Sequence, residues 1–297
     1  MELKLHLNEV SLYKLKEGIR LKADLHTHST ASDGINEPKE NVRLAKEQGL
    51  AAFSITDHDT ISGIDETVET GKKAGIEIVP GIEISTLDKG QDVHILGYFI
   101  QYKNKDFLIA LDELKKVRKK RNGMMIEKLN KLGIQITMDQ VKAKLRKGND
   151  NIGRPHIGEV LIEQGIVGSL EEAFEEYLGR GGKAFINPVR ISPEEGIDII
   201  KKAGGVPVLA HPGLYDDDQL IVRLIKYGIS GIEVYHPEHD EKDKLKYRQL
   251  TEKYKLLFTG GSDFHGSRNG KVYHSPIGSE TVPYEVVKKL KELANKK

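Results

Sequence analysis

Histidines and carboxylates gather in this chain in short clusters that follow apolar runs. The first cluster, Asp24-Leu25-His26-Thr27-His28, ends such a run. Side chains at i and i+2 of a strand point the same way, so His26 and His28 would project together as a pair of ligands for one metal ion. Seven of the eleven histidines lie in clusters of this kind, and the other clusters contain His58, Glu83, His94, His211, His236 and His265. Each uncompensated buried polar group would cost about 1–3 kcal/mol, so this concentration predicts a bound cation.

Composition limits the class of protein. The 297 residues carry a formal net charge of +1, with 38% hydrophobic and 31% charged residues, as in soluble globular proteins. A balanced charge gives no overall attraction to polyanions. The absence of cysteine excludes disulfides and thiolate ligands, which favours a metal held by nitrogen and oxygen. We find neither a signal-peptide pattern nor an apolar run of about 20 residues, so we expect a cytoplasmic protein without membrane contact or an obligatory protein partner.

Apolar segments alternate with helical patterns outside the middle of the chain. Strands are predicted over 19–25, 51–55, 76–80, 93–100, 206–210, 231–235 and 256–259, and helices over 37–48, 62–74, 193–203, 217–227, 241–254 and 284–294. Such alternation predicts an α/β fold with a parallel sheet and right-handed crossovers. We favour a closed barrel over a doubly wound sheet, because the chemical residues follow nearly every strand.

The alternation stops between about residues 102 and 188. Helical patterns over 105–132, 138–146, 156–163 and 170–177 predict a helical insertion, a lid or substrate domain on a barrel formed by 1–101 and 189–297. Arg118 and Arg121 share one helix face, and Arg154-Pro155-His156 opens a later helix. Arginine matches the geometry of phosphate, although the basic run that ends at Arg121 could instead be a solvated face. The few aromatic residues here leave base stacking open: Phe107, Phe174, Tyr177 and Phe185.

Four motifs in order resemble those of the PHP family, named for polymerase and histidinol phosphatase domains. They read Asp24-Leu25-His26-Thr27-His28-Ser29, Thr56-Asp57-His58-Asp59, Leu209-Ala210-His211-Pro212 and Ser262-Asp263-Phe264-His265. The resemblance covers nearly the whole chain outside the insertion. It implies a distorted seven-stranded (β/α)7 barrel with a trinuclear metal centre.

The resemblance also implies a ligand set, which we carry over position by position. The first metal would take His26, His28, Glu83 and Asp263; the second would share Glu83 and add His94 and His211; the third would take His58, His265 and Asp33. We expect Asp24, Asp57 and Asp59 to accept hydrogen bonds from ligand imidazoles. His6, His239 and His274 match no motif, and we expect them at the surface.

Closely spaced divalent ions favour phosphoester hydrolysis. They lower the pKa of a bridging water and stabilise the charge that develops on a phosphate and its leaving group. We therefore expect metal-bound hydroxide to attack phosphorus, with no protein nucleophile. Two to three ions of Mn, Zn or Fe would suit these ligands equally. Beyond the ligands, the candidate catalytic side chains are His236 and Asp57.

The insertion resembles one PHP branch, the phosphatases of nucleoside 3′,5′-bisphosphates that also trim short RNA from its 5′ end. The matching segments are Arg118-Lys119-Lys120-Arg121, Gly153-Arg154-Pro155-His156 and Glu233-Val234-Tyr235-His236-Pro237. This resemblance implies that metals hold the scissile phosphate while Arg118, Arg121, Arg154 and His156 position the rest of the substrate. His236 would contact the substrate or protonate the leaving group. The predicted substrate is a nucleoside 3′,5′-bisphosphate or a short 5′-phosphorylated oligonucleotide; the alternatives are a histidinol-phosphate phosphatase and a non-catalytic PHP metal-binding module.

Overall fold

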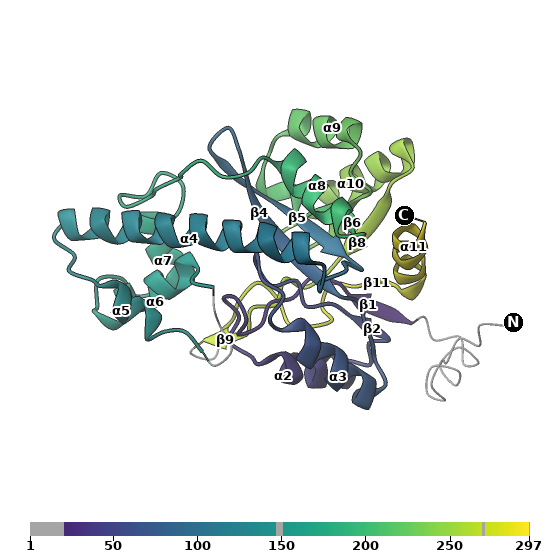
Figure 1. Cartoon of the computed structure of the whole chain (residues 1–297), viewed down its shortest axis with the longest axis horizontal. Helices are drawn as coiled ribbons and strands as arrows, with labels where there is room; N and C mark the ends of the chain where they lie inside the picture. The colour runs from purple at the N-terminus through teal and green to yellow at the C-terminus, as the bar shows by residue number, and fades with distance from the viewer. Residues whose placement is uncertain (1–20, 147–150, 269–270, 297) are drawn as a thin grey trace, which may run out of the picture.

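Two sheets form the centre of the molecule in the computed structural model, which describes residues 21–146, 151–268 and 271–296. The larger sheet has the order β4 (Gly81–Asp88), β5 (Gln91–Tyr98), β6 (Val206–Leu209), β7 (Gly231–Tyr235), β8 (Leu257–Gly260). The smaller has the order β11 (Val282–Pro283), β1 (Lys22–Asp24), β2 (Ala52–Phe53), β3 (Glu77–Ile78). A short pair, β9 (Ser267–Arg268) and β10 (Lys271–Val272), lies apart. The α/β class is confirmed, and Figure 1 shows the arrangement.

The two sheets are joined only loosely in the part of the chain that the structure describes. Isolated bridges pair Thr27 with Phe264 and His58 with Glu83. Hydrogen bonding along these edges is too sparse to form a continuous ladder, so the described strands make two sheets and the predicted closed seven-stranded barrel is not confirmed.

Strands β4 and β5 form an antiparallel hairpin, which corrects the prediction of a wholly parallel sheet. Their register runs from Gly81 opposite Tyr98 to Asp88 opposite Gln91, and β5 also runs antiparallel to β6. The turn consists of Lys89 and Gly90, both with positive φ (46° and 84°), as two-residue hairpin turns require. The sequence pattern missed β4 because its residues continue directly from β3. The pairs β6–β7 and β7–β8 are parallel, as predicted.

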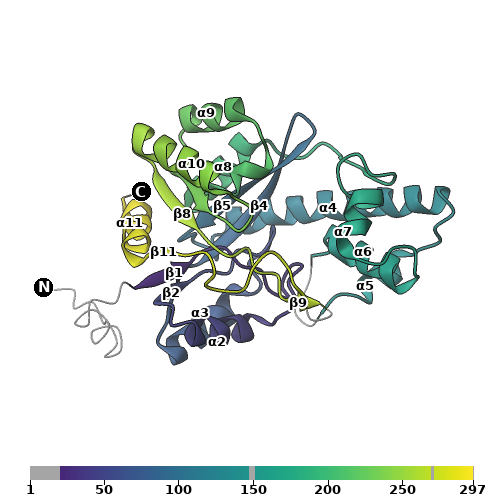
Figure 2. The ribbon, with the colours of Figure 1, turned by 180° about the vertical axis from the view of Figure 1, so that it is seen from behind.

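Helices cover both sheets. In Figures 1 and 2, α8 (Pro193–Lys202), α9 (Asp218–Tyr227) and α10 (Glu241–Tyr254) gather beside the larger sheet. The helices α2 (Pro38–Glu47) and α3 (Ile64–Ala74) lie at the smaller one, and α11 (Tyr284–Asn295) ends the chain. Helix α8 illustrates why these segments fold: Ser192 and Glu195 form a capping box, and Ile197 and Ile200 are buried in the core.

The insertion is built from α4 (Lys105–Lys131), α5 (Met138–Lys142), α6 (Arg154–Glu163), α7 (Leu170–Ala173) and a π-helical turn, η1 (Phe174–Leu178). It has an apolar cluster of its own, which includes Met125, Leu129 and Ile157. The first half of α4 belongs instead to the cluster of the larger sheet, through Leu111 and Leu114. Figures 1 and 2 show α5 to α7 at the end of α4 that points away from the sheets. The predicted domain boundaries stay a prediction.

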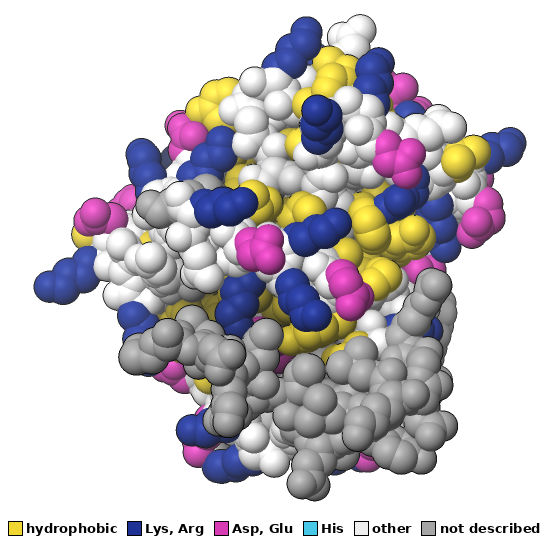
Figure 3. Space-filling view, turned by 90° about the vertical axis from the view of Figure 1, so that its right-hand side faces the viewer, with side chains coloured by type: hydrophobic (Ala, Val, Ile, Leu, Met, Phe, Trp, Pro, Cys, Tyr) yellow, Lys and Arg dark blue, Asp and Glu magenta, His cyan; other side chains and the backbone are white. Residues whose placement is uncertain are grey.

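The described part of the face shown in Figure 3 carries charged side chains of both signs. Lys and Arg side chains there are scattered among Asp and Glu, with apolar side chains between them. Among the described helices, none has both the length and the apolar character that crossing a membrane would require.

Candidate active site

Glu83 is placed in the site by the alternation of β4. Ile82 and Ile84 are fully buried in the core cluster, so Glu83 and Ser85 point to the opposite face of the strand. Glu83 is itself only 1% exposed. A carboxylate buried this deeply requires cationic partners.

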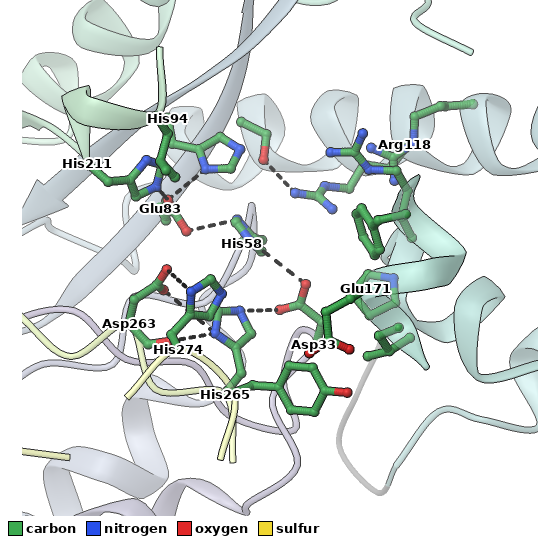
Figure 4. Close-up of a pocket in the computed structure, with 18 of the residues that line it drawn as sticks. Asp33, His58, Glu83, His94, Arg118, Glu171, His211, Asp263, His265 and His274 are labelled. Carbon is green, nitrogen blue, oxygen red and sulfur yellow. Dashed lines mark hydrogen bonds and ion pairs between the residues drawn. The ribbon is translucent and has the colours of Figure 1, made fainter. Parts of the chain in front are cut away.

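Five imidazoles surround the Glu83 carboxylate, and four of them lie within 3.2 Å of it. Its Oε1 lies 2.8 Å from His94 Nδ1 and 3.1 Å from His211 Nε2. Its Oε2 lies 3.0 Å from His58 Nδ1 and 3.2 Å from His28 Nε2. Figure 4 shows His58, His94 and His211 around Glu83. Both carboxylate oxygens are thus placed where a bridging metal ligand would be.

Asp263 completes a second group with the first histidine pair. Its Oδ1 lies 3.2 Å from the Nε2 atoms of both His26 and His28. Those two nitrogens are 3.3 Å apart, so the pair projects together as its i, i+2 spacing predicted. Glu83 Oε2 is also within 3.5 Å of His26 Nε2. The four donors predicted for the first metal therefore converge.

Asp33 lies at the third group. Its Oδ2 is 3.8 Å from His58 Nε2, and its Oδ1 is 3.5 Å from His265 Nε2. The structure thus brings all nine predicted ligands together in overlapping groups, whose donor atoms lie within 4.8 Å of one another in each group. Their assignment to individual metals stays a prediction.

The donor set fits divalent metal ions. Several buried donor atoms make no hydrogen bond, although oppositely charged atoms lie nearby: His28 Nδ1, His58 Nδ1, Glu83 Oε2, His94 Nδ1 and Asp263 Oδ1. Leaving such groups unsatisfied costs about 1–3 kcal/mol each. Imidazole and carboxylate donors converging on shared points suit Mn, Zn or Fe, so a divalent cation would relieve this cost.

The buried histidines and carboxylates of the site shift one another's pKa values. Burial lowers the pKa of His58 and of His211 to about 4, so both imidazoles are neutral, as metal ligands must be. Burial opposes ionisation of Glu83, but the neighbouring histidines hold the pKa of its carboxyl well below the usual range. Burial also disfavours charged His28, yet Asp263 and Glu83 raise its pKa to about 10. The carboxylates in this site therefore attract positive charge.

Glu233 orients two ligands and was not singled out in the sequence. Its Oε1 lies 2.9 Å from His26 Nδ1, and its Oε2 accepts the His211 backbone N–H at 2.8 Å. Glu233 is fully buried on β7. In the sequence it was recognised only as the first residue of the segment Glu233-Val234-Tyr235-His236-Pro237, without a role of its own.

Asp24 and Asp57 do not accept hydrogen bonds from ligand imidazoles, so that prediction was wrong. Asp24 accepts backbone N–H groups from His26, Ser262 and Gly278 at 3.3, 3.0 and 2.9 Å. Asp57 accepts from the backbone and hydroxyl of Ser29 at 2.8 and 2.7 Å. Both fix the backbone of ligand-bearing loops. Asp57 is 2% exposed and outside the described cavity lining, a position that does not favour the predicted catalytic role.

Asp59 also differs from the prediction. Its Oδ1 accepts the Ser85 N–H at 2.8 Å, and its Oδ2 accepts from Arg118 Nε at 2.5 Å. Asp59 therefore anchors the insertion helix α4 to the ligand-bearing hairpin.

His236 and His156 are fully buried, and neither belongs to the cavity lining found among the described residues. His236 Nδ1 accepts the Glu238 N–H at 3.2 Å, so its Nε2, 3.3 Å from Asp263 Oδ2, is the donor of that pair. His156 Nδ1 accepts the Gly153 N–H at 3.0 Å and caps α6. At these positions His236 and His156 hold neighbouring groups in place. This does not favour the substrate contact that was predicted for them.

Of the three histidines expected at the surface, His239 is buried, whereas His274 is exposed as expected. His239 is 3% exposed and links β7 to the turn η2 (Pro212–Leu214): Nδ1 donates to Val234 O at 2.9 Å, and Nε2 accepts the Gly213 N–H at 3.1 Å. His274 is exposed but lines the cavity, with Nδ1 2.9 Å from Glu238 Oε1. His6 lies outside the described residues.

A cavity of about 390 Å³ separates the histidine cluster from the insertion. Its lining includes Arg118, Arg121, Arg154 and Arg190. Figure 4 shows Arg118 and Glu171 on the side opposite Glu83 and Asp263. Positive charge thus faces the candidate metal site across a space of ligand size.

Three of these arginines have carboxylate partners. Arg118 pairs with Asp59, while Arg154 and Arg190 share Asp92. Arg190 was missed in the sequence because it lies in a connecting segment without a motif. Only the fold brings it to Arg154.

Arg121 differs from the other three. It is 3% exposed, its Nε and Nη2 donate only to Asn122 Oδ1 (3.2 and 3.0 Å), and no ion pair of the described residues includes it. Burial, then Arg154 and Arg118, hold its pKa well below the usual range. Neither Arg118 nor Arg121 lies on a solvated face, which removes that alternative for them. An anion in the cavity would compensate the Arg121 charge.

Known proteins resemble this chain over most of its length. A 5′-3′ exoribonuclease of Haemophilus influenzae is 34% identical over 82% of this chain and 90% of its own. A phosphoribosyl 1,2-cyclic phosphate 1,2-diphosphodiesterase of Eggerthella lenta is 29% identical over 84% and 96%. A 3′,5′-nucleoside bisphosphate phosphatase of Chromobacterium violaceum is 31% identical over 83% and 88%.

The fold has a solved counterpart. A structure from Bifidobacterium adolescentis described as a metal-dependent phosphoesterase superposes with a TM-score of 0.84 at 30% identity, covering 91% of this chain and 96% of that one. The sequence profile of the PHP domain matches residues 24–178, from the first motif to the end of η1. The ligand cluster, the cavity and these similarities together show that this chain belongs to the PHP domain family and is a metal-dependent phosphoesterase, a hydrolase.

Proposed function

We propose that this protein hydrolyses a phosphate ester of nucleoside 3′,5′-bisphosphates or of short 5′-phosphorylated oligonucleotides. The scissile phosphate would lie at the histidine cluster, and a second phosphate would lie at the insertion. The observation that carries this proposal is Arg121, a buried cation without a carboxylate partner on the far side of the same cavity.

The present contacts of each residue indicate the role that it would have in the reaction. Two to three divalent ions bound by the cluster would supply a water of lowered pKa and neutralise phosphate charge. Arg118 and Arg154 are held by Asp59 and Asp92, so they shape the cavity. Arg121 would donate to the second phosphate, where charge-assisted hydrogen bonds are strong. Arg190 would assist, since its buried Nε has no hydrogen-bond partner in the described structure.

The alternatives explain less of the site. Histidinol phosphate carries one phosphate, which would leave the charge of Arg121 uncompensated. A non-catalytic metal-binding module does not explain why a cavity lies between the candidate ligands and several arginines. The similarity to an exoribonuclease and a nucleoside bisphosphate phosphatase supports the nucleotide assignment.

A substrate panel tests the proposal. Purified enzyme loaded with Mn²⁺ is assayed with adenosine 3′,5′-bisphosphate, 5′-phosphorylated dinucleotides, histidinol phosphate and phosphoribosyl 1,2-cyclic phosphate. We expect kcat/KM to be highest for the first two. Activity confined to histidinol phosphate or to the cyclic phosphate would overturn the proposal. The double variant His26→Ala/His28→Ala, which lacks two of the predicted ligands, is the control for contaminating phosphatase.

A further inference from the structure

One wall of the cavity is apolar and belongs to the insertion. Pro155 at the start of α6, Leu170 of α7 and Phe174 of η1 all line it. The rest of the lining consists of the histidine cluster and the arginines, together with Ser85, Glu171, Leu214 and Tyr273. A substrate that fills the cavity must therefore present an uncharged surface to this wall.

Phe174 is the first residue of the π-helical turn and lines the cavity. The Gly179 N–H bonds to Phe174 O at 2.7 Å, an i→i+5 bond that adds one residue to the turn. Ala173 and Leu178 are fully buried in the apolar cluster of the insertion, and Tyr177 packs against it. Phe174 belongs to none of the four apolar clusters of the described residues. Phe174 therefore lines the cavity without being part of an apolar core, and its ring is available to a ligand.

The ring is held in place by Arg154. The Arg154 guanidinium carbon lies over it, 5.5 Å from the ring centroid. Among the described residues, no other ring or cation contacts Phe174. Since an aromatic ring has two faces, a planar ligand can stack on the second.

The charge of this wall excludes phosphate. Glu171 lies next to Leu170 and also lines the cavity. A carboxylate repels a phosphate oxygen, whereas the arginines and the metal site attract one. Glu171 therefore disfavours a phosphate beside Leu170, which leaves the second face of the Phe174 ring to the uncharged part of the substrate.

We propose that Phe174, supported by Leu170 and Pro155, forms a stacking site for the nucleobase of the substrate. This inference rests on the proposed function and deepens it, because it makes the base itself a recognised group. Stacking is tolerant of base identity, since every base has a π face. The site would favour nucleotides over phosphoribosyl compounds that lack a base.

A single-tryptophan reporter tests the stacking directly. The chain contains no tryptophan, so Phe174→Trp introduces one indole at the wall. With Zn²⁺ present, adenosine 5′-monophosphate should quench its fluorescence, and ribose 5-phosphate should not. The matched control is Tyr177→Trp, on the same turn but packed against the insertion core, which neither ligand should quench. Equal quenching of Phe174→Trp by both ligands, or by neither, would overturn the proposal.

Kinetics of Phe174→Leu provide a second test that keeps an apolar side chain. Losing about 1–3 kcal/mol of stacking should raise KM for adenosine 3′,5′-bisphosphate about 5- to 150-fold with kcat unchanged. KM for 1-deoxyribose 3,5-bisphosphate, which lacks a base, should stay the same. Equal changes for both substrates would refute the stacking site and leave the proposed function standing. If the wild type hydrolyses neither compound, the proposed function fails, and the fluorescence titration still decides the stacking site.

Discussion

Single side chains in this protein differ in how completely their charge is compensated. Glu83 has five imidazoles around it, and Asp59 has Arg118 and a backbone N–H. Arg121 has only a neutral amide oxygen. Buried charge without compensation is costly, so the uncompensated positions indicate where ligands bind.

Glu233→Gln tests the support of the metal ligands. The amide cannot accept from both His26 Nδ1 and the His211 N–H as the carboxylate does. Loss of such an orienting group costs about 10- to 100-fold in metal affinity. We expect Glu233→Gln to lower the affinity for Zn²⁺ by this factor, as measured by competition with a chelating dye. Glu66→Gln, on the exposed face of α3, should leave affinity unchanged; equal affinity in both variants would refute the role of Glu233.

Arg121→Gln tests the second phosphate site. Hydrogen bonds to charged groups contribute about 1.5–3 kcal/mol, so KM for adenosine 3′,5′-bisphosphate should rise roughly 10- to 150-fold. Hydrolysis of a 3′-monophosphate, which has no second phosphate, should change little. Lys120→Gln is the control, as Lys120 is exposed on the same helix. An equal loss of activity on both substrates would mean that Arg121 supports the structure of the site and does not bind the second phosphate.

Close approach between backbone segments of different secondary-structure elements brings the candidate ligands together. The strand β8 ends at Gly260, and Gly261 follows directly against the first histidine motif. A Cβ at Gly261 would lie 2.3 Å from His26 N and 2.5 Å from His26 Cβ. Because backbone cannot give way there, the position requires glycine.

Gly261→Ala should therefore destabilise the fold, by about 1–3 kcal/mol or more as overpacking does. Gly123→Ala is the matched control: it lies inside α4 with nothing within 4 Å of the added carbon. Alanine there should stabilise by roughly 0.5–1 kcal/mol. Urea unfolding monitored by circular dichroism measures both. Similar midpoints for the two variants would contradict the close packing at Gly261.

At the scale of the whole molecule, helix α4 connects two apolar cores. Leu111 and Leu114 pack with the larger sheet, Met125 and Leu129 with the insertion. The paired arginines lie between these segments, where the cavity opens. The metal cluster in turn joins both sheets, through ligands such as Glu83 and His58.

Metal removal should lower the stability of the whole fold. A ligand at 100 times its Kd stabilises by about 2.7 kcal/mol. For a chain of this size that shifts Tm by roughly 4–5 °C. Differential scanning fluorimetry of chelator-treated protein, before and after adding Mn²⁺, measures the shift. The variant His26→Ala/His28→Ala should not respond; an equal Tm for apo and loaded wild type would contradict the predicted metal centre.

The sequence by itself determined which residues could serve as metal ligands and most of the elements that carry them. His26 and His28 lie two residues apart on an extended segment, and the helical and strand periods of α8, α9 and β7 are local properties of the chain. Local spacing therefore predicted the pair of His26 and His28, the resemblance to the PHP family implied the other ligands, and the structure brings them together.

Only the tertiary structure decided how these elements pair and which charges meet. The antiparallel hairpin of β4 and β5, the contact of Arg190 with Asp92 and the burial of His236 behind Asp263 join residues far apart in sequence. The orientation of Phe174 depends on a π-helical turn packed against a separate core. Long-range packing sets these features, because solvent access and charge compensation are properties of the folded chain and not of any local segment.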